Sequence, residues 1–513
     1  MKKLLIILAC AATPVSLCAE QWQVLGTRPM GMGGAFVAVA QGPIAQYWNP
    51  AGLVKSSANV SGMEIPVGVV AEFTGDIIKN ASEIGDLANS FTATQDSQRG
   101  GGSINAEQVA AYAKTLSLMS DMNEPGKGAL FEIAGGVNFK FSKVALSVNN
   151  FTSVGLNPFI DTTNVGLGDG TGLSGVDFGT VSNVDPAADK LAARNSIESA
   201  ITGIGFANLE TLMCGTGGCS ASEGAITTAQ QLANVIINSS GLTADQLNTA
   251  AATLNEYAAT LSPIVANAVG SPTNAYTNNT SNLTVAGASF MEVVAGYAWN
   301  KDKWIPGLSV GGNLKLVNGR TVVTTFRFLS ESDTKDAFKM EDMKSSWKPS
   351  MDLGFLWDVN KRYPKFPLRP KIGLVMRNIN SPSFDTSSGA DYDLDRQVRL
   401  GFALNPAKFW TLAMDVDLTK NKTPVSGFDS RQLCMGTEIN IVNRKAFNIP
   451  LRAGIMSNLA EKDSKLAYTL GTGLNLLFMH FDVSGVVSSE RTELEGEKIP
   501  TKVGVAASFG LLF

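Results

Sequence analysis

Few residues in this chain of 513 combine the type and the position that catalysis requires. The single histidine, His480, lies on the same side of an alternating segment as Asp482 and Ser484. Acid–base and nucleophilic catalysis need side chains that converge on one point, whereas residues i and i+2 of a strand point in parallel. We therefore expect His480 to join a hydrogen-bond network, and we predict that the protein is not an enzyme.

Two other motifs lack the local structure that their chemistry needs. Gly307 to Gly311 matches G-x-S-x-G, but Ser309 falls inside an alternating strand rather than at a strand-to-helix elbow. Every second residue from Asp391 to Asp395 is aspartate, as at the start of a calcium loop, yet Arg396 stands where glycine must make the sharp turn. We interpret this stretch as a solvated acidic loop, with adventitious Ca²⁺ left open. We predict no dedicated metal site and no cofactor.

Two cysteines lie close together in the middle of the sequence. Cys214 and Cys219 flank Gly-Thr-Gly-Gly, a flexible turn that can bring two sulfur atoms together in an oxidising compartment. No histidine and no further cysteine lie nearby, so a metal site is the weaker interpretation. The sequence favours a disulfide between Cys214 and Cys219 but does not establish that the two are paired.

A set of cations offers a site for binding rather than for catalysis. They stand on the polar side of alternating segments, at Lys315, Arg377, Arg399 and Arg452. Each can neutralise an acidic side chain across the interior, or can hold the carboxylate head of an amphipathic ligand by a charge-assisted contact. In the second case apolar residues such as Phe36 and Phe290 would accept the tail. Both roles are open.

The elements that must position these residues are strands with a period of two. Apolar and polar residues alternate from Leu130 to Phe141, Leu308 to Leu316, Val398 to Leu404 and Trp410 to Leu418. From Leu283 onwards such segments recur at the spacing of strand, turn and strand in an up-and-down barrel. A soluble sandwich also alternates, but roughly a dozen strands of about ten residues fit one closed wall with its apolar side toward lipid.

Composition agrees with a protein of the cell envelope. Only 17% of the residues are charged, and 51 are glycine. Met1 to Ala19 has two lysines, an apolar run and small residues, which predicts a secretory signal that is cut after Ala19. No later apolar run approaches the ~20 residues of a transmembrane helix. A net charge of -4 without a basic stripe argues against nucleic acid as a partner.

A Gly-dense, nearly uncharged segment from Gly26 to Leu53 follows the signal. Glycine permits positive φ and close backbone approach, so the segment can be threaded against a wall. Near its end Pro50 fixes φ and pushes Asn49 towards an extended conformation. We interpret it as a plug inside the barrel, with a plain Gly-rich strand and turn as the alternative. The positions that we assign to the plug are Gly31, Gly33, Gly34, Asn49, Pro50 and Ala51.

The order Gly-x-Arg-x-x-Gly-Met-Gly-Gly-Ala-Phe-Val-Ala, followed by Tyr-Trp-Asn-Pro-Ala-Gly-Leu, resembles the start of the FadL-type outer-membrane transporters. Related TraF-like and PorV-like barrels are near neighbours. The resemblance implies a β-barrel of about fourteen strands with this segment as an internal hatch, and it carries over to Asn49, Pro50 and Ala51. The chain also stops on an aromatic residue, Phe513, which resembles the end that outer-membrane proteins present to the insertion machinery.

These features divide the chain into a signal peptide (1–19), a plug (20–58) and a barrel (59–513). Two stretches of the barrel show helical patterns instead of alternation, at about 76–123 and 187–268. In the first, Asn105 can cap a helix; in the second, Thr243 and Gln246 form a capping box. Because the lipid-facing wall must consist of closed strands, we expect the first to lie outside the membrane region and the second to be a helical insertion on a long extracellular loop. For the second insertion, a lid or ligand-capturing surface and a passive spacer are equally open as roles.

The sequence thus predicts an all-β protein, a transmembrane antiparallel barrel in contact with the lipid of the bacterial outer membrane. As the resemblance implies, we expect passive, ligand-gated transport of hydrophobic or amphipathic small molecules, with long-chain fatty acids as the first candidate. The alternative, also from resemblance, is a TraF-like or PorV-like barrel that anchors or assembles envelope or secretion machinery.

Overall fold

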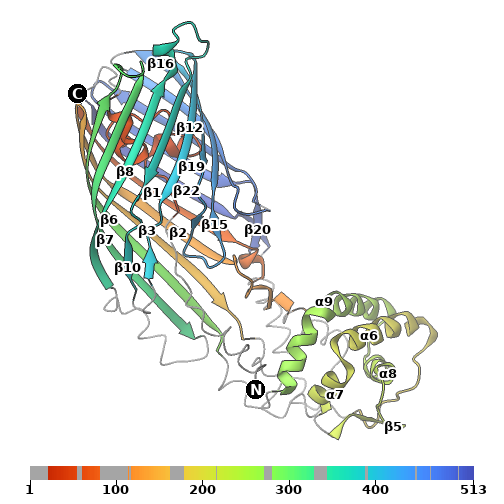
Figure 1. The fold of residues 1–513 in the computed structure, drawn as a ribbon. Helices are drawn as coiled ribbons and strands as arrows, with labels where there is room; N and C mark the ends of the chain where they lie inside the picture. The colour runs from red at the N-terminus through yellow and green to blue at the C-terminus, as the bar shows by residue number, and fades with distance from the viewer. Residues whose placement is uncertain are drawn as a thin grey trace.

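Fourteen strands close into one antiparallel barrel in the computed structural model (Figure 1). The ring is completed where the first strand pairs with the last, from Gly62 opposite Leu512 to Glu72 opposite Lys502. The structure describes residues 21–54, 61–80, 114, 117–118, 120–161, 178–214, 217–270, 280–327, 344–386, 391–444, 447–462, 464–494 and 496–512. The predicted signal peptide, the helix cap at Asn105 and the terminal Phe513 lie outside these residues.

The wall strands, in order around the barrel, are β1 (Ser61–Thr74), β2 (Gly128–Phe141), β3 (Val144–Phe159), β6 (Asn282–Asn300), β7 (Leu308–Arg327), β8 (Lys344–Asp358), β9 (Lys371–Arg377), β12 (Gln397–Ala407), β13 (Trp410–Asp417), β16 (Gln432–Arg444), β17 (Phe447–Asn458), β18 (Ala467–Leu476), β19 (Met479–Ser488) and β22 (Lys502–Leu512).

The period-two pattern becomes the two faces of this wall. On β2, Phe131 and Ile133 are exposed on the outside, whereas Asn138 and Lys140 are buried on the inside. The turn into β3 passes through Ser142 at a φ of 57°. On β22, Val503 and Val505 likewise face out. With apolar side chains outward around a ring that has no free edge, the predicted transmembrane barrel is confirmed.

The two ends of the barrel differ in their connections. Short links join β2 to β3, β6 to β7, β8 to β9, β12 to β13, β16 to β17 and β18 to β19, and we call this end the turn end. The short helix α12 (Val359–Arg362) belongs to it. The opposite, loop end carries the long connections, with three hairpins formed by β10 (Ser383–Asp385) and β11 (Asp391–Asp393), β14 (Asn421–Lys422) and β15 (Asp429–Ser430), and β20 (Arg491–Leu494) and β21 (Glu497–Pro500).

A helical subdomain interrupts the chain between β3 and β6 and lies outside the barrel, beyond the loop end (Figure 1). Its core contains Ile197, Leu232, Val235, Leu247 and Leu254. The subdomain comprises η2 (Ala188–Lys190), α6 (Leu191–Ile204), α7 (Phe206–Cys214), β4 (Ser220–Ala221), β5 (Gly224–Ala225), α8 (Ala229–Ser239) and α9 (Ala244–Gly270). These elements occupy the second predicted insertion, 187–268, whereas most of the first, 76–123, lies outside the described residues. Among the described residues, no helix is both long enough and apolar enough to cross a bilayer.

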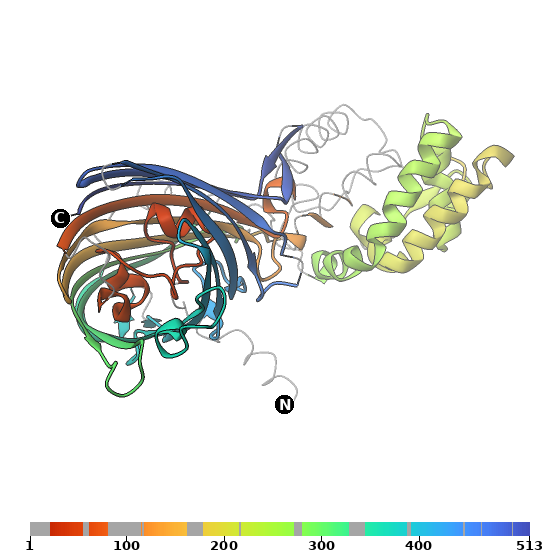
Figure 2. The ribbon, with the colours of Figure 1, turned by 90° about the horizontal axis from the view of Figure 1, so that it is seen from above.

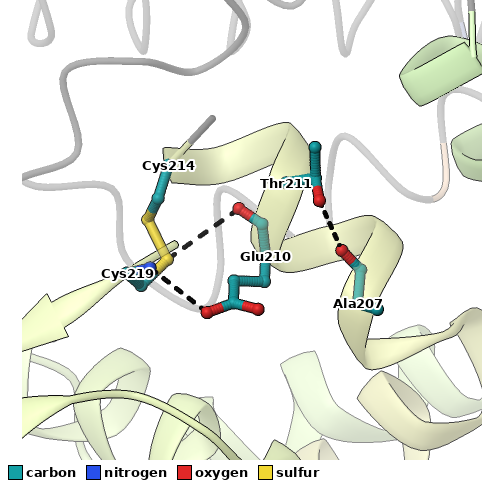
Figure 3. The surroundings of a disulfide bond; sticks show 5 residues. All are labelled: Ala207, Glu210, Thr211, Cys214 and Cys219. Carbon is teal, nitrogen blue, oxygen red and sulfur yellow. Dashed lines mark hydrogen bonds between the residues drawn. A yellow bond between two sulfur atoms is a disulfide. The ribbon is translucent and has the colours of Figure 1, made fainter. Parts of the chain in front are cut away.

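Local contacts explain two features of this subdomain. The backbone N–H of Thr243 donates to Gln246 Oε1 (3.0 Å) and that of Gln246 donates to Thr243 Oγ1 (3.4 Å), so the capping box opens α9 as predicted. Cys214 and Cys219 form a disulfide with their Cα atoms 5.2 Å apart. Figure 3 shows Cys219 beside Glu210, whose carboxylate accepts the Cys219 backbone N–H at 3.2 Å.

Residues 21–54 lie inside the barrel, and we call this segment the plug (Figure 2). It contains α2 (Thr27–Gly31), α3 (Ala45–Trp48) and η1 (Pro50–Val54). Only Gln41 is exposed in the whole segment. The N-terminal plug is therefore confirmed, and it is the structure around which the lumen side chains are arranged.

The plugged lumen as candidate functional site

Aromatic rings hold the plug together. Trp22 stacks on Trp48 with ring centroids 6.1 Å apart, and Phe36 meets Trp48 edge-on at 5.9 Å. The Trp48 indole N–H donates to the carbonyl of Leu25 at 2.9 Å, and the Tyr47 hydroxyl donates to that of Gln23 at 2.6 Å. These contacts fold the start of the plug onto α3, so that the segment behaves as one packed body.

The Asn-Pro-Ala sequence fastens the end of the plug to the wall. Asn49 is extended (φ -163°, ψ 104°), as the following proline predicts. Its side-chain amide donates to the carbonyl of Phe355 on β8 (3.0 Å), and its Oδ1 accepts the backbone N–H of Ala51 (3.1 Å). The wall makes room with a glycine, because a Cβ on Gly354 would lie 2.8 Å from Pro50 Cδ.

The Gly33–Gly34 turn brings the plug into direct contact with the wall backbone. Both residues have positive φ, 66° and 88°. A Cβ on Gly33 would lie 2.6 Å from the carbonyl oxygen of Ile455, and one on Gly34 would lie 2.9 Å from Cys434 Sγ. A Cβ at position 33 would therefore force the plug off β16 and β17, because it would meet the wall backbone, whereas a Cβ at position 34 would meet only the Cys434 side chain.

Charged residues continue the attachment. Arg28 of the plug is bound to Glu438 of β16, and Arg452 of β17 donates to the same carboxylate at 2.8 Å. The other side of Arg452 reaches Asp482 of β19 at 2.6 Å. Arg452, one of the predicted ligand-binding cations, is therefore neutralised on both sides within a buried chain that includes the plug.

Arg399 has a similar place on the neighbouring part of the wall. It donates twice to Asp417, at 2.5 and 3.1 Å, and its guanidinium carbon lies 4.5 Å from the centroid of the Trp22 ring. Asp415, two residues before Asp417 on β13, accepts the backbone N–H groups of Phe36 (2.7 Å) and Val37 (2.8 Å). The wall thus contacts the plug in two ways: the Arg399 guanidinium lies over an aromatic ring, and the Asp415 carboxylate accepts two backbone N–H groups.

The predicted residues Phe290, Lys315 and Arg377 are brought together on β6, β7 and β9. Lys315 Nζ lies 3.2 Å from Glu292 and 2.9 Å from Asp352, and Arg377 lies 3.3 Å from the same Glu292 oxygen. Lys315 also contacts the side-chain oxygen of Asn378. We call this set the cation cluster (Glu292, Lys315, Asp352, Arg377 and Asn378).

The cation cluster contacts the plug through Arg377. Its guanidinium carbon lies 4.0 Å from the Tyr47 ring centroid and 5.2 Å from that of Trp22. The other predicted members of the ligand site lie elsewhere: Arg399 and Arg452 belong to separate ion pairs, and Phe36 is inside the plug beneath Arg28 (5.2 Å).

An apolar cluster adjoins the cation cluster on its loop-end side. Phe290 stands two residues from Glu292 on the inward face of β6, and the β10–β11 hairpin folds Phe384 and Tyr392 onto it at 5.2 and 5.4 Å between ring centroids. Its remaining members are Ala288, Val317 and Leu394. The alternating aspartates predict a solvated acidic loop here. Asp391 and Asp393 are exposed, but Tyr392 between them is buried. The alternation Asp-Tyr-Asp indicates opposite faces, whereas the contact of Tyr392 with Phe290 depends on how the hairpin folds onto the wall.

The remaining sequence candidates fall where strand alternation predicts. Ser309 lies within β7 and is buried. His480 points inward from β19 with its ring against Gly510, but its Nδ1 has no hydrogen-bond partner among the described residues, so the expected network does not form at this nitrogen. Glu132 is buried on the inward face of β2, and its Oε1 has no hydrogen-bond partner among the described residues. Within the same residues, no group of three or more His, Cys, Asp or Glu is placed to hold a metal ion.

The comparisons with known proteins place the chain in a family. The family described as "F plasmid transfer operon, TraF, protein" matches residues 46–417, which is most of the chain, and the protein belongs to this family. No curated protein matches it. The TraF-like resemblance noted from the plug sequence is thereby confirmed.

Several solved structures are similar to the protein. The P. putida toluene transporter TodX has 10% sequence identity and a TM-score of 0.43, covering 96% of this chain and 99% of that one. The CymD monoaromatic hydrocarbon channel has 11% identity and a TM-score of 0.41, covering 95% and 97%. A Pseudomonas aeruginosa FadL homologue has 8% identity and a TM-score of 0.37, covering 96% and 98%.

Proposed function

We propose that the protein is an outer-membrane channel for hydrophobic or amphipathic small molecules, which it passes when the plug shifts. The observation that carries this proposal is the placement of an apolar cluster around Phe290 directly beside the cations Lys315 and Arg377 inside the lumen. Such a pair of surfaces suits a ligand that has a hydrocarbon tail and an acidic head. Long-chain fatty acids are the substrates of this kind to test first.

Arg377 supplies the link between ligand and plug. It is held by Glu292 on one side and lies over the Tyr47 ring on the other. A ligand carboxylate competes with Glu292 for the same guanidinium, and its arrival therefore changes the position of a group that packs on the plug. Transport is passive in this scheme, driven by the substrate's own gradient.

Uptake of labelled fatty acid by cells that express the protein, compared with cells that lack it, tests the proposal. We expect uptake to depend on the protein, and Arg377→Gln to lower it more for a fatty acid than for an uncharged hydrocarbon. Arg396→Gln is the matched control, because Arg396 is exposed at the loop end. Equal uptake with and without the protein would remove the transport function.

A second candidate function, anchoring of envelope machinery, is favoured by the helical subdomain. It packs around its own core, carries the disulfide between Cys214 and Cys219, and lies outside the barrel. Replacing residues 187–268 by a short flexible linker separates the two functions. Loss of a co-purifying partner with unchanged uptake would support anchoring, whereas impaired uptake would support a role of the subdomain in capturing the transported molecule.

A further inference from the structure

Two turns at the turn end pack into one unit. The backbone N–H of Asp358 donates to the carbonyl of Gly307 at 3.0 Å, and the Trp357 indole N–H donates to that of Pro306 at 3.2 Å. Asp302 accepts the Gly307 N–H at 2.7 Å and lies 3.8 Å from Lys361. We call this unit, residues 301–307 and 358–370, the basic turn pair.

The basic turn pair exposes large apolar side chains. Trp304 is 76% exposed, Phe366 54% and Tyr363 53%, and Ile305 and Leu368 are exposed as well. None of them belongs to a buried cluster among the described residues. Side chains of this size are normally packed or placed at an interface, so their exposure calls for a partner.

The same unit is strongly cationic. It holds Lys301, Lys303, Lys361, Arg362, Lys365 and Arg369, six cations, against two acids, Asp302 and Asp358. Six minus two leaves a net charge of +4, although the whole chain carries -4. Lys301 Nζ lies 4.6 Å from the Trp304 ring centroid, which places a cation directly over an exposed aromatic face. Cations and apolar groups are therefore mixed on one surface.

The conformation of the second turn is fixed. Prolines at 364, 367 and 370 restrict the backbone. Leu368 and Arg369 both have positive φ, 62° and 46°, which is unfavourable for these residues and persists only where neighbours hold it. The carbonyl of Leu368 accepts the backbone N–H of Asn405 on β12 at 2.7 Å. A surface already ordered in this way loses little entropy when it binds.

The geometry points to a binding site for anionic phospholipid headgroups in the leaflet that surrounds the turn end. The lysines and arginines would pair with headgroup phosphates, while Trp304, Tyr363 and Phe366 lie at the boundary between headgroups and hydrocarbon. Basic residues beside a membrane surface attract anionic lipid, and aromatic residues concentrate at the same depth.

The position of the turns favours lipid over an acidic protein. Tyr297 and Trp299 stand on the outward face of β6 just before the first turn, so the exposed aromatic surface of the wall continues into Trp304. The β6–β7 connection also extends away from the barrel wall (green, Figure 2). A binding site for a soluble protein is expected instead on side chains that point along the barrel axis, into the aqueous phase.

Native mass spectrometry of the full-length protein, released from mixed micelles with phosphatidylglycerol or phosphatidylcholine of the same chain length, tests the site. The test variant combines Lys361→Gln, Arg362→Gln, Lys365→Gln and Arg369→Gln. The matched control removes the same charge from exposed loop-end positions by Lys462→Gln, Lys465→Gln, Arg491→Gln and Lys498→Gln. Heat-modifiable migration in gels shows that each variant is folded.

We expect the wild-type protein and the control to retain phosphatidylglycerol at least about tenfold better than phosphatidylcholine, and the test variant to retain both alike. The preference should fall as salt is raised, because exposed charges are screened. Equal retention of the two lipids by the wild type would overturn the proposal. A site that binds an acidic peptide instead of lipid would give this result. A preference that survives in the test variant would overturn it too.

Discussion

Arg28 of the plug and Glu438 of β16 form a two-pronged ion pair, with Nε 2.8 Å from Oε2 and Nη2 2.8 Å from Oε1. Such bidentate contacts are among the strongest polar contacts in proteins. The two residues are 410 positions apart in the chain, so the pair joins the N-terminal plug to a strand near the C-terminal end of the sequence.

Removing this pair should loosen the plug. Arg28→Ala leaves Glu438 with Arg452 alone, and we expect a loss of about 1.5–3 kcal/mol of plug attachment, the usual size for hydrogen bonds to a charged group. Planar-bilayer recordings should then show more frequent openings than the wild type. Arg28→Lys keeps the charge but not the two-pronged geometry, and should be intermediate. Identical recordings for all three proteins would show that the pair does not hold the plug.

Asp415 should be a second fastening point. Asp415→Ala removes the acceptor of the Phe36 and Val37 backbone N–H groups. Both N–H groups then stay buried without this hydrogen bond, which is unfavourable. We expect faster hydrogen exchange at these two amides and greater protease sensitivity of residues 31–51, with the wall strands unchanged. Asp391→Asn, at an exposed position of the β10–β11 hairpin, is the control. Unaltered exchange at Phe36 would contradict the assignment.

Strand alternation was sufficient to predict the barrel and the face on which each residue lies. Phe131 outward and Lys140 inward follow from the period of two, because one face of the wall meets lipid. The plug was predictable because Pro50 and the glycines before it restrict or free the backbone locally. The capping box of Thr243 and Gln246 is local in the same sense.

Pairings between distant strands were beyond such reasoning. The sequence placed Lys315, Arg377, Arg399 and Arg452 in the lumen but did not divide them into separate ion pairs, since partners such as Glu292 and Arg377 meet only through strand order and register. Inward folding of the β10–β11 hairpin depends on Tyr392 finding Phe290, which local patterns do not encode.

The helical subdomain should lose stability in acid through Glu223. The backbone N–H of Asn183 donates to this carboxylate at 2.7 Å and the Ser182 hydroxyl at 2.9 Å, and the pKa of Glu223 lies below its ordinary value of 4.5, chiefly because of the Asn183 contact. A lowered folded-state pKa gives stability that is present above 4.5 and is lost as the pH falls through the lowered value. Thermal unfolding followed by circular dichroism should show this loss of stability in the helical signal. In Glu223→Gln the loss on acidification should be smaller. An equal loss in the two proteins would exclude Glu223 as its source.

Movement of the plug is the central claim, and a reversible tether between Gly34 and β16 tests it most directly. A Cβ built on Gly34 lies 3.7 Å from Cys434 Cβ, close to the ~3.8 Å of natural disulfides, and Cys434 is free. In Gly34→Cys we predict that oxidation stops fatty-acid uptake and that a reductant restores it, while Gly34→Ala, which shares the positive φ but has no sulfur, responds to neither. Full uptake by Gly34→Cys with the disulfide formed would contradict passage by displacement of the plug.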